Sequence, residues 1–196
     1  MKRQIHITAR VAVAAALLLL AAPVPAAQVD YFLKISGVEG EAKDAAHKEE
    51  IELLSWSWGE TNDSVQIVEI GPFVVHKTTD RATPLLVEAC LTGKELTSAV
   101  LVAEKPTSGK PIPYLRYKLE RCFVSSYQLG GGSAAERDSV PVDSFSLNFS
   151  KIEWEYTRHD EATSRPLEAI TGGYDVDSGT FLPGATRVGP AWSNLR

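Results

Sequence analysis

Alternation of apolar and polar positions predicts a series of β-strands along this chain. Residues 29–35 place Tyr31, Leu33 and Ile35 on one side and Asp30 and Lys34 on the other, which is the period of a half-buried strand. Similar runs predict further strands at residues 50–58, 64–70, 73–77, 98–104, 114–127 and 143–156. Strands therefore make up most of the predicted secondary structure.

The strand predicted at residues 50–58 carries apolar side chains on both sides. Leu54, Trp56 and Trp58 share one face, whereas Ile51 and Leu53 share the other. We therefore expect both faces of this strand to be partly covered.

The last long strand changes its apolar phase partway along. In residues 143–156 the first set of apolar positions is Phe145, Leu147 and Phe149, and the second set is Ile152, Trp154 and Tyr156. An extra residue in a strand shifts the alternation by one position. The pattern therefore predicts a β-bulge near Ser150 and Lys151.

Turn residues and a helix separate these strands. Residues 37–44 are polar and glycine-rich, which predicts a surface loop that needs no ladder partners, and residues 60–64 predict a turn. Thr83 is the expected N-cap of the predicted helix, with Pro84 at its first position, and Gly93 is expected to end it. The face expected to dock on the sheet contains Leu86, Ala89 and Cys90.

Residues 1–26 have the layout of a secretory signal peptide. Lys2, Arg3 and Arg10 precede or flank an apolar run at residues 11–22, and Val24-Pro25-Ala26 forms a small-residue cleavage site. The apolar run falls short of the roughly 20 residues that span a bilayer. We expect cleavage after Ala26, export to the periplasm or the medium, and no membrane association afterwards. If the signal is not used, the protein stays in the cytoplasm.

Length and charge limit the classes of protein further. The 196 residues suit one domain, with 44% hydrophobic and 23% charged residues. Removing residues 1–26 leaves 17 basic and 25 acidic residues, a net charge of −8. A protein this acidic, without a Lys/Arg-rich run, is not expected to bind nucleic acid.

Histidine spacing does not point to a metal site. His47 lies beside Glu49 and Glu50, a grouping compatible with a metal, but a solvated loop histidine is the favoured interpretation. His159 precedes Asp160 and Glu161 and is expected in a charged loop. His76 has no partner at metal-binding spacing, so no metal or cofactor is predicted.

No catalytic constellation is predicted either. The chain lacks a G-x-S-x-G elbow, and the three glycines at 130–132 are not followed by the Lys-Ser/Thr of a phosphate loop. Glu153 and Glu155 are expected on the solvated face of a strand. Trp56, Trp58 and Trp154 could form a sugar platform, but packing is favoured for large aromatics on strands. The chain is therefore not expected to be an enzyme.

Two cysteines, Cys90 and Cys122, leave two alternatives open. An even count in an exported protein permits one disulfide. Free cysteines also behave as small buried hydrophobes, and this second alternative is favoured.

Residues 29–59 resemble the opening motif of the Hcp family, the ring-forming tube proteins of bacterial type VI secretion systems. The matching positions are Val29, Asp30, Lys34, Ile35, Gly40, Glu41, Asp44, His47, Glu50, Ile51, Trp56, Trp58 and Gly59. A second family motif, D-x-x-(S/T)-P-x-L-x-x-A-C-x-x-G-K, is matched by Asp80, Thr83, Pro84, Leu86, Ala89, Cys90, Gly93 and Lys94. Residues 173–176 resemble the last strand of the family.

The resemblance implies a fold and a function. The fold implied for residues 27–177 is a compact β-barrel of two mostly antiparallel sheets with one flanking α-helix. The implied function is a structural subunit whose homohexamers stack into a tube, carry effector cargo in the lumen and meet other secretion components. The alternative is an exported Hcp-like binding or ring protein that does not join the tube. The extension at 178–196 could pack along a neighbour, remain loose or make an additional contact.

Overall fold

The structure is a computed structural model that describes residues 28–62, 68–107, 109–131, 140–183 and 187–189. The predicted signal peptide and its cleavage site lie outside the described residues, as does most of the strand predicted at 64–70. No helix in the described part of the chain is long and apolar enough to cross a membrane.

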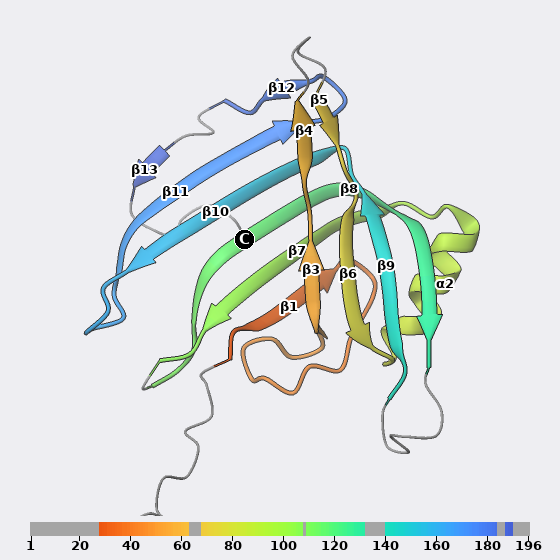
Figure 1. The fold of residues 1–196 in the computed structure, drawn as a ribbon, viewed down its shortest axis with the longest axis horizontal. Coiled ribbons are helices and arrows are strands. Elements are labelled where there is room, and N and C mark those ends of the chain that lie inside the picture. Colours follow the sequence, from red (N-terminus) through yellow and green to blue (C-terminus); the bar gives the residue numbers. More distant parts are fainter. Residues whose placement is uncertain (1–27, 63–67, 108, 132–139, 184–186, 190–196) are drawn as a thin grey trace, which may run out of the picture.

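Strands dominate the fold, with one helix at the side of the sheets (Figure 1). The strands are β1 (Asp30–Ile35), β2 (Ile51–Glu52), β3 (Ser55–Ser57), β4 (Glu60–Asn62), β5 (Val68–Ile70), β6 (Phe73–Thr78), β7 (Leu96–Lys105), β8 (Ile112–Gly130), β9 (Val142–Asn148), β10 (Lys151–His159), β11 (Pro166–Asp175), β12 (Thr180–Phe181) and β13 (Arg187–Gly189). The helix is α2 (Ala82–Thr92).

Two sheets share the long strand β8. The first sheet has the order β12-β11-β10-β8-β7-β1-β2, with β13 also paired to β11, and the second continues from β8 through β9 and β6 to β3. Every ladder is antiparallel, and Figure 1 shows β8 sweeping from one sheet into the other. The expected two mostly antiparallel sheets with a flanking helix are therefore confirmed.

The sheets do not close into the expected barrel. The strand predicted at 50–58 is split into β2, which pairs with β1, and β3, which pairs with β6. At the split, the Leu53 N–H donates to Tyr31 O, and the Leu54 N–H donates to His76 O. The chain thus passes from one sheet to the other at this point. As a result Leu54 is exposed, although the alternation placed it on the same face as Trp56.

The β-bulge predicted near Ser150 and Lys151 is wrong, because the pairing with β8 keeps one register across this point: Phe123 faces Asn148 and Glu120 faces Lys151. The predicted strand is instead broken into β9 and β10. β9 and β10 both pair with β8, and the Ser150 N–H between them donates to Glu120 O at 3.1 Å. Opposite the break, Arg121 adopts a left-handed φ of 52°. Phe149 before the break and Ile152 after it both face the core. The break between β9 and β10 therefore keeps a single apolar face through the change of phase, without an extra residue.

The helix packs its apolar side on β8. Leu86 and Ala89 are fully buried there, while Cys90 is half-buried. Gly93 ends the helix with a φ of 65°, as predicted. The predicted N-cap is wrong, because Thr83 already lies within the first helical turn and its hydroxyl is engaged in a buried polar cluster.

The loop predicted at 37–44 is packed rather than free. The Gly40 N–H donates to Glu49 O at 2.8 Å, and the Ala42 N–H donates to Glu50 O at 3.0 Å. A Cβ at Gly40 would overlap the Glu50 carbonyl, so glycine is needed for this close approach. The turn predicted at 60–64 is wrong for residues 60–62, which form β4 and pair with β5 in a projecting hairpin. Residues 63–67 are outside the described chain.

Candidate functional site

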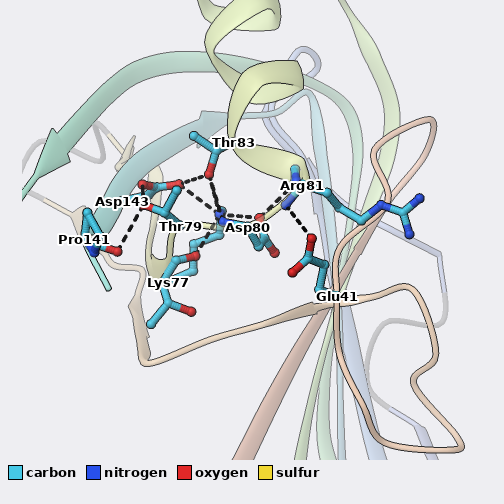
Figure 2. Close-up of polar contacts among 10 residues, drawn as sticks. Glu41, Lys77, Thr79, Asp80, Arg81, Thr83, Pro141 and Asp143 are labelled. Atoms are coloured by element: carbon cyan, nitrogen blue, oxygen red, sulfur yellow. Dashed lines mark hydrogen bonds and ion pairs between the residues drawn. The ribbon is translucent and has the colours of Figure 1, made fainter. Parts of the chain in front are cut away.

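A buried polar cluster ties the start of the helix to the second sheet, and Figure 2 shows its side chains converging. Lys77 on β6 is fully buried, and its Nζ lies 2.6 Å from Asp80 Oδ1 and 2.8 Å from Asp143 Oδ2. Nζ also donates to the Thr83 hydroxyl at 3.0 Å, and the Thr79 hydroxyl donates to Asp143 Oδ1 at 2.9 Å. The cation is thereby matched by two carboxylates from different elements.

Hydrogen bonding decides the charge state of Asp143. Burial alone raises the pKa of its carboxyl, but bonds from Lys77 and Thr83 outweigh burial and hold that pKa below its usual range. The Asp80 carboxylate completes the arrangement by accepting the Ala82 N–H at 2.9 Å. The cluster therefore fixes the position of the helix relative to the second sheet. The hydrophobic pattern does not reveal this cluster, whose signal in the sequence is the Lys-x-x-Asp spacing before the helix.

His47 is buried between two carboxylates, so the predicted solvated loop histidine is wrong. Its Nδ1 lies 2.8 Å from Glu50 Oε2, and its Nε2 lies 3.1 Å from Glu104 Oε1. The ring stacks on Phe32 with centroids 4.0 Å apart. Burial alone lowers the pKa of His47, but the two carboxylates outweigh it and raise the pKa to about 9. The imidazolium therefore fastens the loop before β2 onto β1 and β7.

Two more charged positions are less exposed than predicted. Glu155 is buried and accepts a bond from the Thr157 hydroxyl at 3.3 Å, whereas Glu153 stays near the surface beside Lys151. His159 is buried at the end of β10, where burial lowers its pKa and its Nδ1 lies 3.1 Å from Thr157 O. The charged-loop interpretation holds only for the residues after His159.

The three tryptophans do not form one platform. Trp56 stacks on Phe73 with centroids 5.4 Å apart, and Trp58 and Trp154 lie together at 6.4 Å. All three pack against the hydrophobic core. Trp154 in addition lies against Gly172, where any Cβ would overlap the indole. Core packing explains these residues.

An apolar cleft of about 330 Å³ lies between the projecting hairpin and the end of the first sheet. It is lined by Trp58, Glu60, Asn62, Val68, Ile70, Ile152, Trp154, Tyr174 and Phe181. Its apolar walls fit an apolar side chain better than a charged ligand.

Exposed apolar side chains also lie on the part of the first sheet that the second sheet leaves uncovered. Tyr156 on β10 and Ile170 on β11 are directly opposite each other and are 46% and 43% exposed. Such patches mark contact surfaces between proteins. We call this pair the β10–β11 patch.

The described residues contain no group of three His, Cys, Asp or Glu side chains that could hold a metal ion. Cys90 and Cys122 are both free thiols, which resolves the two alternatives against a disulfide in this structure. Burial raises the pKa of the Cys122 thiol to about 12, so it is chemically inert.

Comparison with known proteins connects this fold to one family. The protein-family model described as "Type VI secretion system effector, Hcp" matches residues 32–156, which contain most of both sheets and the helix. Protein hcp1 of Pseudomonas aeruginosa is 34% identical over 137 residues, which cover 65% of this chain and 83% of that protein.

Solved structures agree. Hcp1 from Salmonella typhimurium superposes with a TM-score of 0.66 and 32% identity, covering 79% of this chain and 99% of the other. A type VI secretion system effector from Yersinia pestis superposes with a TM-score of 0.61 and 28% identity, covering 75% of this chain and all of the other.

Proposed function

The chain belongs to the Hcp family of the type VI secretion system, and we propose that it is a structural subunit that forms hexameric rings, which stack into a tube able to carry effectors. The observation that carries this proposal is the family match over residues 32–156, because that range holds the helix and most of both sheets. The role is mechanical and needs no bond-making chemistry.

Surface features support assembly. The β10–β11 patch exposes two large apolar side chains to water, which is unfavourable in free energy, and association would bury them. The projecting hairpin β4–β5 extends beyond the second sheet, where it can reach another subunit. The polar groups of the Lys77 cluster are satisfied within the subunit, so they serve its stability rather than chemistry.

Light scattering and electron microscopy of the purified protein test the ring. We expect a particle of six subunits with a central opening. Tyr156→Glu should weaken assembly by placing a charge in the β10–β11 patch, whereas Leu91→Glu, at a position 83% exposed on the helix, should assemble normally. A protein that remains monomeric at high concentration would contradict the proposal.

The competing candidate is an exported Hcp-like protein that does not join the tube, and the signal-peptide pattern of residues 1–26 favours it. Cell fractionation with N-terminal sequencing separates the two. Export predicts a periplasmic or secreted protein that begins at Ala27. A cytoplasmic protein that retains residues 1–26, or begins near Val29, contradicts export.

Effector cargo and other secretion components are the partners proposed for a ring that joins the tube. Cargo should co-purify with assembled rings and be lost from Tyr156→Glu, because only the ring encloses a lumen. Equal recovery of cargo with both assembly states would argue against transport in the lumen.

A further inference from the structure

β11 is a ten-residue strand whose two edges have different partners. Its inner edge pairs with β10 along almost its whole length. Its outer edge would otherwise end the first sheet, yet β12 pairs there with Tyr174 and Asp175, and β13 pairs with residues 169–171. Figure 1 shows both short strands lying along β11. An unpaired edge of this length would present N–H and C=O groups that accept another strand.

The turn after β11 is built to send the chain back along that edge. Asp175 Oδ1 accepts hydrogen bonds from the Ser178 N–H at 2.8 Å and the Ser178 hydroxyl at 2.9 Å. Gly179 has a φ of 66°, which glycine adopts without strain. Asp177 within the turn also pairs with Arg121 at 3.0 Å. The reversal is therefore encoded locally.

Side-chain fit holds the returning segment in place. The Leu182 N–H donates to Gly173 O at 3.0 Å. The Leu182 side chain fills the space beside Gly173, where a Cβ would lie 2.5 Å from Leu182 Cδ1. The rings of Phe181 and Tyr174 meet edge to face with centroids 5.3 Å apart. A two-residue ladder alone would be marginal, and these contacts make it specific.

We propose that the outer edge of β11 can accept a strand from a second copy of this chain. The chain's own segments Thr180–Leu182 and Arg187–Gly189 cover this edge and so prevent that pairing. The inference rests on the proposed ring-forming function, since it concerns a second contact between copies that the tail of the chain would block. The partner that these segments exclude is an extended antiparallel strand. The same edge of another copy can supply such a strand through a two-fold contact. The outermost strands that remain have two and three residues, a length that resists edge-to-edge pairing.

A chain that ends at Asp177 tests this inference against the full chain. We expect the shortened protein to form larger, concentration-dependent species in light scattering, with unchanged far-ultraviolet circular dichroism. A peptide of residues 178–189 added in excess should reverse the association, whereas a scrambled peptide should not. Identical mass distributions for the two chains at every concentration would overturn the inference.

A second measurement covers the case in which the shortened chain does not fold. In the full chain, Leu182→Pro removes the N–H that bonds Gly173, and Leu182→Ala keeps it. Leu182→Pro should associate more than Leu182→Ala, and hydrogen exchange should show the Leu182 amide protected in the unmodified chain. Exchange at the rate of an unstructured peptide, with equal association of both variants, would refute the inference that the chain's own tail covers the outer edge of β11.

The two proposals fail in different ways. A full chain that gives no hexamer contradicts the ring, whatever its tail does. A full chain that forms hexamers, and a shortened chain that behaves in the same way, contradict only the inference that the tail protects the β11 edge.

Discussion

Lys77 Nζ lies 2.8 Å from Asp143 Oδ2, and both side chains are fully buried. The pair joins β6 to β9, and through Thr83 and Asp80 it reaches the helix. A buried ion pair adds little net stability over an apolar pair, but removing one partner leaves the other charge uncompensated.

Lys77→Met should therefore destabilise the protein by about 3–5 kcal/mol, because Asp143 would remain buried without its cation. Urea denaturation followed by tryptophan fluorescence measures the free energy of unfolding. The matched control is Arg81→Met, which removes an exposed pair with Glu39 and should cost no more than about 1 kcal/mol. Equal losses for both variants would show that Lys77 is not the anchor.

The stability of the protein should fall as the pH rises through the pKa of His47. The folded pKa is about 9 and the ordinary value is 6.5, so the stabilisation is fully present below 6.5 and is lost as the pH passes 9. At about 1.4 kcal/mol for each pKa unit, the difference of about 2.5 between these two pKa values sets an upper limit of about 3.5 kcal/mol on this loss.

Denaturation curves between pH 6.5 and 10 for the unmodified protein and for His47→Gln measure this effect. The variant should be less stable at pH 7 and should show a flatter dependence on pH in that window. Parallel curves for the two proteins would rule out His47 as the titrating group.

Gly40→Ala should destabilise the loop before β2, because the new Cβ would overlap the backbone of Glu50. Overpacking against backbone costs about 1–3 kcal/mol or more. Gly59→Ala is the control, since nothing lies within 4 Å of a Cβ at that position. Thermal unfolding should show a lower midpoint for Gly40→Ala only, and an unchanged midpoint would indicate that the loop is not packed as described.

Thiol titration should find two free thiols in the unfolded protein, because Cys90 and Cys122 are unpaired. In the native protein Cys122 should not react, since it is fully buried and its thiol pKa is raised to about 12. Cys90 is half-buried, so any thiol that reacts before unfolding should be that of Cys90. Fewer than two thiols after unfolding without reductant would reveal a disulfide.

Several elements could be predicted because their signals are local. The alternation of Tyr31, Leu33 and Ile35 predicted β1, and Gly93 predicted the end of the helix. A period of two or a glycine in the left-handed region depends only on neighbouring residues. Such features are therefore readable from a single sequence.

Burial of charged groups could not be predicted in this way. His47 looked like a loop residue, yet it is covered because its loop folds back onto Phe32 and Glu104. Lys77 is likewise buried because its partner Asp143 is contributed by a strand distant in the sequence. A charge can be buried only where partners converge, and their convergence is a property of the assembled sheets.

The sequence by itself determined most of the strands, the end of the helix and the family. Only the tertiary structure decided that the sheets stay unclosed at Leu53 and Leu54, that His47 is clamped, and that the tail returns to β11. The first group follows from the alternation of side chains along one strand. The second depends on which distant backbone and side-chain groups meet, since hydrogen bonds and ion pairs between strands form only after the chain has folded.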